Sequence, residues 1–307
     1  MRVDSSPDQD TAGPLARHAL RIPVERAVSE HLGRTWTTRR IRDMSDFACH
    51  PSAILSGSSY SVFAKYSDAP NGCEQFEIEL AGLRLLSERA GVRTPAPIGI
   101  VAVEGGTILV LEAVQAVERS SRHWRQIGQT LARIHTIEGE CFGLDTDGYF
   151  GPVYQDNTPA RDWPTFYADR RLWPGLRMAV DSGNLPPAAI GQVEQLIARV
   201  PQLCGPEIAP TLLHGDAQQN NYISTDLGPV VIDPAVYYGH PEMDLAQVDL
   251  FAPVPEDLFD GYRDARPIDP GFWDRRDLWR VWGYLASVAA EGRGYLPQLV
   301  GAVQKYV

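Results

Sequence analysis

The feature that most constrains this chain is a polar loop followed, after a short gap, by a β-branched run that ends in an aspartate. The loop spans His214 to Asn221, and the later run spans Val230 to Pro234. Asp216 and Asn221 lie in the loop, and Asp233 closes the run. The β-branched residues favour a strand, and the residues between the two segments favour a hairpin turn. Side-chain oxygens of Asp and Asn are the ligands that hard divalent cations such as Mg²⁺ prefer.

This spacing suits phosphoryl transfer. That reaction needs a carboxylate to position the attacking hydroxyl and metal ligands to neutralise charge on the β and γ phosphates. The catalytic loop of protein kinases has His-x-Asp followed five positions later by Asn, and Asp216 and Asn221 have the same interval. We therefore predict that Asp216 is catalytic and that Asn221 and Asp233 bind Mg²⁺. Taken alone, the loop is equally compatible with an ordinary turn in which Asp233 caps the segment after Pro234.

A lysine and a glutamate upstream fit a nucleotide site. The segment 60–66 is rich in aromatic and β-branched residues, which predicts a strand with Lys65 near its end. The segment 74–89 has apolar residues at three- and four-residue steps, which predicts an amphipathic helix. Glu79 falls inside the apolar stripe, whereas Glu77 lies on the opposite face. Because an unpaired buried carboxylate is costly, we expect Glu79 to pair with Lys65, as in the pair that clamps nucleotide phosphates.

The segments around these residues resemble the fructosamine (ketosamine) kinase family, which shares a superfamily with the aminoglycoside phosphotransferases. The resemblance runs from about Ser61 to the C-terminus, and its most specific part is the string Asp233 to Leu245. The other matching segments are Phe76 to Leu83, Phe142 to Gly151, and Asp162 to Leu172. The resemblance implies a two-lobed protein-kinase-like fold of the α+β class. It also implies ATP-dependent phosphorylation of a sugar hydroxyl on a ketosamine, such as a fructosamine or ribulosamine, formed by glycation of an amine.

By position, the resemblance assigns the same roles to the residues discussed above. Lys65 and Glu79 would clamp ATP, Asp216 would be catalytic, and Asn221 and Asp233 would bind Mg²⁺.

Four further residues or segments receive supporting roles. Backbone groups of the segment from Glu112 to Val114 are expected to bind the adenine edge at a hinge. His214 is expected to brace the loop, and His135, at the edge of a helical apolar stripe, to be a packed structural histidine. Asp244 begins a predicted helix, Met243 to Phe251, which it could cap, while the resemblance suggests that it braces the catalytic loop.

The chain departs from the family pattern at two places. Residues 217–220 read Ala-Gln-Gln-Asn where the family usually has Leu-Trp-Ser-Gly, which predicts a different floor for the sugar pocket. The phosphate-covering loop, residues 43–57, has a single glycine, although Ser45 or Ser52 could donate hydrogen bonds there. Two alternatives therefore stay open: a phosphotransferase for another small alcohol, such as an aminoglycoside, and a catalytically silent nucleotide-binding protein.

An aromatic segment rich in Gly and Pro, residues 142–173, is too long and irregular for a simple connector, and long loops in compact domains are often functional. Tyr154 and Trp163 could stack on a sugar or amine, and Asp156 could accept a hydrogen bond from a hydroxyl or ammonium. The competing interpretation, that the aromatic residues only pack the loop against the second lobe, is equally compatible with the sequence.

The domain organisation is derived from these assignments. We expect a disordered tail at residues 1–14, a nucleotide-clamping N-lobe at residues 15–114, and a catalytic and acceptor-binding C-lobe at residues 115–307. Strands are expected in segments 54–66, 98–103 and 107–112, and helices in segments 22–32, 74–89, 124–135 and 273–288.

Composition limits the other classes of function. A net charge of −11 without long runs of Lys or Arg argues against nucleic-acid binding. Apolar stretches are too short to span a bilayer, and the polar N-terminus lacks the features of a signal peptide. The four cysteines have no Cys-x-x-Cys spacing, so neither zinc nor a disulfide framework is indicated. We therefore expect a cytoplasmic enzyme with a small-molecule or glycated-amine substrate, whose oligomeric state the sequence leaves open.

Overall fold

The computed structural model describes residues 13–47 and 49–307, and the chain divides into two compact units. The first contains the residues up to Arg84 together with 93–118 and 223–232, and the second contains 85–92, 119–222 and 233–307. The predicted lobes are each one continuous segment, whereas the chain enters each unit more than once. Of the predicted tail, residues 1–12 lie outside the described part of the chain, and a short 3₁₀ helix, η1, begins at Pro14.

The first unit is built on a five-stranded antiparallel sheet with the order β1-β2-β3-β5-β4. Its strands are β1 (Arg40–Asp43), β2 (Ser52–Ser56), β3 (Ser61–Ser67), β4 (Pro97–Val103) and β5 (Gly106–Glu112). A 3₁₀ turn, η2 (Ser45–Phe47), lies between β1 and β2. The strands predicted from segments 54–66, 98–103 and 107–112 are confirmed, because β-branched and aromatic residues suit these pleated, largely buried positions.

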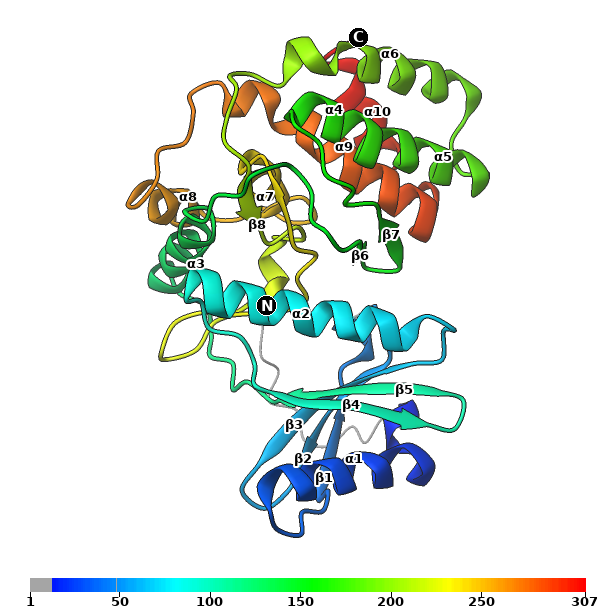
Figure 1. Ribbon diagram of the computed structural model, residues 1–307, viewed down its shortest axis with the longest axis vertical. Helices are drawn as coiled ribbons and strands as arrows, with labels where there is room; N and C mark the ends of the chain where they lie inside the picture. The colour runs from blue at the N-terminus through cyan, green and yellow to red at the C-terminus, as the bar shows by residue number, and fades with distance from the viewer. Residues whose placement is uncertain (1–12, 48) are drawn as a thin grey trace. The chain divides into compact units, whose positions relative to one another are not determined.

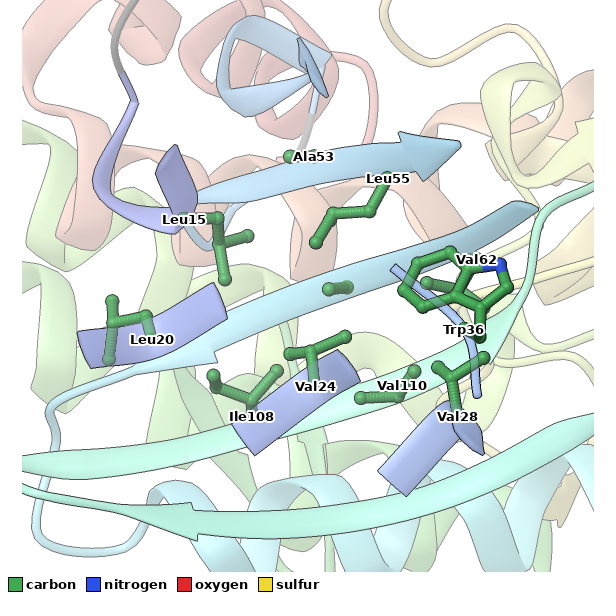
Figure 2. Packing of buried hydrophobic residues seen from close by; sticks show 11 residues of the cluster. Leu15, Leu20, Val24, Val28, Trp36, Ala53, Leu55, Val62, Ile108 and Val110 are labelled. Atoms are coloured by element: carbon green, nitrogen blue, oxygen red, sulfur yellow. The ribbon is translucent and has the colours of Figure 1, made fainter. Parts of the chain in front are cut away.

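Helix α1 (His18–Leu32) covers one face of this sheet (Figure 1). Its buried side chains recur at four-residue steps, which places Leu20, Val24 and Val28 on one face of the helix. They pack against the side chains of alternate strand residues, which include Ala53, Leu55, Val62, Ile108 and Val110 (Figure 2). The helix begins four residues before the predicted Ile22.

Helix α2 (Gly72–Ala90) lies on the other face of the sheet. Phe76, Leu80 and Leu83 pack there against Leu109 and Leu111 of β5. The predicted helix at residues 74–89 is thus confirmed, and its apolar stripe faces the sheet as the three- and four-residue spacing requires.

The second unit is mainly helical. Its helices are α3 (Ser121–Ile134), α4 (Trp163–Tyr167), the π-helical η3 (Ala168–Leu172), α5 (Trp173–Asp181), α6 (Pro187–Leu203), α7 (Glu242–Gln247), α8 (Glu256–Arg263), α9 (Phe272–Glu291), η5 (Arg293–Tyr295) and α10 (Leu296–Gln304). The long helix α9 packs against α5 and α10 (Figure 1). Its buried face carries Trp279 and Trp282. The helices predicted around residues 124–135 and 273–288 correspond to α3 and α9.

Short strand pairs position the polar residues. Strand β8 (Thr211–Leu213) pairs antiparallel with β11 (Tyr237–Gly239), and β6 (Gly148–Phe150) pairs with β7 (Val153–Gln155). Strand β9 (Tyr222–Ile223) pairs with β10 (Val230–Val231), as the predicted hairpin requires, and the turn η4 (Gln219–Asn221) precedes β9.

One helix prediction is wrong in its length and in the role of its first residue. Helix α7 spans Glu242–Gln247 rather than Met243 to Phe251, and Pro241 occupies its N-cap position. Asp244 therefore lies inside the first turn and does not cap the helix, because its carboxylate is used elsewhere.

Candidate active site

The polar loop from His214 to Asn221 begins directly after β8. Because β8 pairs with β11, the segment that leads into β11 lies beside the start of the loop. The Ala235 N–H donates a hydrogen bond to the His214 carbonyl at 2.8 Å. This pairing brings the segment that begins at Asp233 against the loop that carries Asp216.

Asp244 holds the start of this loop. Its Oδ2 accepts a hydrogen bond from the His214 N–H at 2.7 Å, and its Oδ1 accepts one from the Gly215 N–H at 3.0 Å. The ring of His135 is 3.1 Å from Oδ2 through Nε2, and its Nδ1 is 2.9 Å from the Tyr262 hydroxyl. Burial lowers the pKa of His135, which keeps the ring neutral with Nε2 as the donor. His135 is therefore the packed structural histidine that the sequence predicts.

His214 braces the loop from within. It is fully buried, its Nδ1 accepts a hydrogen bond from the Asp216 N–H at 3.2 Å, and its ring packs against Tyr222 at 5.5 Å between centroids. The acceptor role of Nδ1 leaves no proton on that nitrogen. This placement favours a structural role for His214 over proton transfer.

Two further residues that the sequence did not reveal also hold the loop. The Gln247 carboxamide accepts a hydrogen bond from the Ala217 N–H at 3.1 Å. The Arg119 guanidinium donates to the Gln219 carbonyl at 3.2 Å and to the Tyr222 carbonyl. In the sequence Arg119 is one charged residue before a helix, and no local pattern distinguishes it from a solvated arginine.

The backbone of the site is held in two conformations that side chains rarely adopt. Gly215 has φ +81°, and a Cβ at this position would lie 1.9 Å from the Ala235 carbonyl oxygen. Asp233 has φ +52°, and it is the one non-glycine residue with positive φ in the described chain. For a non-glycine residue such as Asp233, a positive φ costs on the order of 1–3 kcal/mol and is typical of functional sites, where surrounding contacts enforce it.

Asp216 and Asn221 meet in this loop. The Asn221 Nδ2 donates to the Asp216 carbonyl at 2.8 Å and to the Asp216 Oδ2 at 2.9 Å, and the Gln218 Nε2 donates to the same Oδ2 at 3.3 Å. The Asp216 Oδ1 accepts no hydrogen bond from any residue within 13–47 or 49–307, and its side chain is partly exposed. One carboxylate oxygen is thus fixed, and the other is open to a ligand.

The pKa of Asp216 is raised to about 7. Burial is the largest cause, and the nearby carboxylates of Asp233 and Asp244 raise it further, while the amide donors of Gln218 and Asn221 lower it. A carboxylate with a pKa near neutrality can accept a proton at physiological pH, which is the property that a general base needs.

The oxygen donors of this site fit a magnesium ion bound together with phosphates. The Asn221 Nδ2 donates both of its hydrogen bonds to Asp216. The Asn221 Oδ1 accepts no hydrogen bond from any of the described residues, so it is available to a ligand. Asp233 lies close enough to Asp216 to affect its pKa. The described residues contain no cluster of three His, Cys, Asp or Glu that would hold a metal alone. Mg²⁺ commonly takes one or two carboxylates and completes its shell with phosphates and waters.

The first unit contains the predicted nucleotide clamp. The Lys65 Nζ on β3 lies 2.8 Å and 3.0 Å from the two carboxylate oxygens of Glu79 on α2. The Lys65 side chain is 5% exposed and that of Glu79 is 14% exposed, whereas Glu77 is exposed on the opposite face. The helix-face argument that separated Glu79 from Glu77 is confirmed.

Two other predicted nucleotide contacts lie in the same unit. Glu112 is the last residue of β5 and its side chain is exposed, and two residues later the Val114 N–H bonds to no other residue in the described ranges. The Ser45 hydroxyl donates to Asp43 at 2.6 Å, and the hydroxyl of Ser52 is buried without a partner in the described chain. The Ser45 hydroxyl is therefore occupied within the loop.

The acceptor residues proposed from the aromatic segment separate into two kinds. The hydroxyl of Tyr154, an exposed residue of β7, donates to Asp147 directly before β6, and Asp156 pairs with Arg170 at 3.2 Å. Trp163 is only 3% exposed, and its ring is enclosed by other aromatic rings. Those rings belong to Phe142, Phe166, Tyr167, His240 and Trp279. Packing, rather than stacking on a sugar, is the role that this placement of Trp163 supports.

Comparison with known proteins identifies the family of the chain. The family model for fructosamine kinase matches residues 22–307. The chain belongs to the fructosamine kinase family. A probable ketoamine kinase of Synechocystis is 30% identical over 279 residues, which cover 90% of this chain and 92% of that protein. The ketosamine-3-kinase of Mus musculus is 30% identical over 275 residues, which cover 79% of this chain and 88% of that protein.

Solved structures give the fold of this fructosamine kinase family member. A protein of Thermobifida fusca YX-ER1 assigned as a fructosamine-3-kinase has a TM-score of 0.81 at 31% identity, covering 92% of this chain and 98% of that one. An aminoglycoside phosphotransferase has a TM-score of 0.59 at 13% identity, covering 93% and 99%. The second likeness shows the fold alone and confirms the predicted kinase-like class. None of the helices in the described ranges is long and apolar enough to cross a membrane.

Proposed function

We propose that this protein transfers the γ-phosphoryl group of ATP to a sugar hydroxyl of a ketosamine, such as a fructosamine or ribulosamine on a glycated amine. Membership of the fructosamine kinase family supports this reaction class. The names of the mouse relative and of the Thermobifida structure specify 3-kinases, so we place the transferred group on the 3-hydroxyl.

The observation that carries the proposal is the hydrogen bonding of the Asp216 carboxylate. Its Oδ2 is held by Asn221 and Gln218, and its Oδ1 is open. In the proposed reaction Oδ1 accepts a hydrogen bond from the acceptor hydroxyl. The hydroxyl oxygen forms a bond to the γ-phosphorus, the bond between that phosphorus and the ADP oxygen breaks, and the hydroxyl proton passes to Asp216. Positioning and charge neutralisation supply most of the rate enhancement in such reactions.

The remaining site residues have binding roles in this proposal. Asn221, through Oδ1, and Asp233 would hold Mg²⁺, which neutralises phosphate charge when it is bound. Lys65, held by Glu79, would bind the α and β phosphates. Backbone groups between Glu112 and Val114 would bind adenine. That Lys65 and Asp216 act on one nucleotide stays a prediction.

A second candidate function is phosphorylation of another alcohol, such as an aminoglycoside. The residues at 217–220 favour it, because they replace the family sequence directly beside the catalytic carboxylate. We also place the reaction in the cytoplasm, where ATP is available and where four free cysteines are stable.

A panel of acceptors tests the proposal. The protein is incubated with γ-labelled ATP and Mg²⁺ and with fructosyl-lysine, ribulosyl-lysine, unmodified lysine or an aminoglycoside. We expect label in the two ketosamines and none in lysine. Label confined to the aminoglycoside would favour the second function. Nucleotide binding by calorimetry without label in any acceptor would favour a silent nucleotide-binding protein.

A further inference from the structure

Gln218 stands beside the catalytic carboxylate but has no assigned role. Its side chain is partly exposed, and its Nε2 donates to the Asp216 Oδ2 at 3.3 Å. The neighbouring Gln219 points elsewhere and donates to the Ala252 carbonyl at 2.9 Å. Of these two consecutive glutamines, only Gln218 contacts the reacting group.

The orientation of the Gln218 carboxamide is set by its partner. An ionised carboxylate accepts hydrogen bonds and repels a carbonyl oxygen, so the Nε2 must face Asp216. The Oε1 then points away from Oδ2. This oxygen is accessible to solvent, and it bonds to no residue in the described chain.

The two open oxygens make a pair of acceptors. The Asp216 Oδ1 and the Gln218 Oε1 belong to two side chains that a single hydrogen bond, from Nε2 to Oδ2, holds together. A vicinal diol presents two hydroxyl donors at a short separation. A simple alcohol presents one, and would leave the Gln218 Oε1 without a partner once the acceptor displaces water.

We propose that Gln218 selects acceptors that carry a second hydroxyl beside the one that is phosphorylated. The inference rests on the proposed function: Asp216 accepts the hydrogen bond of the reacting hydroxyl, and Gln218 accepts that of its neighbour. For a ketosamine phosphorylated at position 3, this neighbour is the 4-hydroxyl. Because the site is partly open, we expect the smaller effect of one neutral hydrogen bond, roughly tenfold or less in kcat/KM, rather than the far larger discrimination of fully enclosed sites.

The test removes each hydrogen-bond partner separately. The wild type and Gln218→Met are assayed with fructosyl-lysine and with its 4-deoxy analogue. We expect the wild type to prefer the full sugar by roughly 5- to 10-fold in kcat/KM and the variant to show a preference below twofold. Methionine also removes the bond to Asp216, but that loss lowers both rates and cancels in the ratio.

A second variant separates substrate selection from orientation of Asp216. In Gln218→His the ring Nε2–H occupies about the place of the glutamine Nε2, so the donor to Asp216 is kept while the acceptor oxygen is lost. We expect it to lose the preference for the full sugar but to exceed Gln218→Met in kcat. Gln195→Met, on the exposed surface of α6, is the matched control and should keep the wild-type ratio. Thermal unfolding confirms that each variant is folded.

The results that overturn each claim are distinct. An unchanged preference in Gln218→Met, or no preference in the wild type, would refute the role of Gln218 while leaving ketosamine phosphorylation intact. Failure of the wild type to label any ketosamine would instead refute the proposed function. The same ratio would then be measured with two aminoglycosides that differ by one hydroxyl next to the reacting one.

Discussion

Replacing Asp216 by Asn should abolish phosphoryl transfer and, at the same time, stabilise the protein at alkaline pH. Most of the water around the carboxylate is displaced by protein, and the carboxylates of Asp233 and Asp244 are near, so ionisation in the folded state is unfavourable. Asparagine has nearly the same shape, and its side-chain oxygen can still accept hydrogen bonds from Asn221 and Gln218. The substitution therefore removes the charge without removing the packing.

The raised pKa of Asp216 sets the size of the stabilisation that we expect from this substitution. The value in the folded protein is about 7, against an ordinary value of 3.8. A raised pKa means that the folded state binds the proton more tightly than the unfolded state. The associated stability is present below pH 3.8 and is lost as the pH rises toward 7. The full difference between the two pKa values corresponds to roughly 4 kcal/mol in the free energy of unfolding. Because the Asp216 side chain is partly exposed to solvent, we expect an effect of about 1–2 kcal/mol.

Urea unfolding of the wild type and Asp216→Asn, with EDTA present to remove metal ions, measures this effect. We expect the variant to gain about 1–2 kcal/mol in free energy of unfolding at pH 8 and almost nothing at pH 4. Asp226→Asn, at an exposed turn, is the charge-matched control and should show no pH-dependent gain. A gain that is equal at both pH values, or no gain at pH 8, would refute the electrostatic reasoning.

Three further predictions concern other residues. Glu79→Ala should raise the KM for ATP at least severalfold more than Glu77→Ala, since Glu79 pairs with Lys65 whereas Glu77 lies on the opposite face of the helix; equal effects in kinetic assays would contradict the clamp. Gly215→Ala should destabilise the fold by about 2–4 kcal/mol in urea unfolding, because the added Cβ meets a carbonyl 1.9 Å away, and a loss below about 0.5 kcal/mol would contradict this. Burial lowers the pKa of His240 to about 3, so its neutral form stabilises the fold at neutral pH and that stability is lost as the pH falls below 6.5. Between pH 7 and pH 5 the free energy of unfolding of His240→Gln, measured in urea, should therefore fall by about 1–2 kcal/mol less than that of the wild type. Equal falls in the two proteins would contradict the prediction.

Local periodicity predicted the Lys65–Glu79 pair and the elements that carry it. The spacing of apolar residues determines which face of a helix is buried, and a glutamate on that face requires a cation. The strands in segments 54–66, 98–103 and 107–112 and the helices around 74–89, 124–135 and 273–288 were predictable for the same reason. The loop from His214 to Asn221 was recognisable as a candidate site because the interval from Asp216 to Asn221 is itself local.

Long-range contacts account for what the sequence did not reveal. Arg119 and Gln247 hold the loop from His214 to Asn221 from positions about 100 and 30 residues away, and no local pattern marks such partners. The positive φ of Asp233 depends on neighbouring segments rather than on residue type. Trp163 could stack on a ligand or pack in the core with the same local sequence, and only its surroundings distinguish the two.

The decisive experiment locates the transferred phosphoryl group and asks whether its transfer needs Asp216. Fructosyl-lysine is incubated with ATP and Mg²⁺ and either the wild type or Asp216→Asn, and the product is examined by ³¹P NMR. We expect a phosphomonoester on the sugar 3-hydroxyl with the wild type and no product with the variant, although both bind ATP equally. A phosphorylated product at a comparable rate from Asp216→Asn, or none from the wild type, would show that Asp216 does not catalyse ketosamine phosphorylation in this protein.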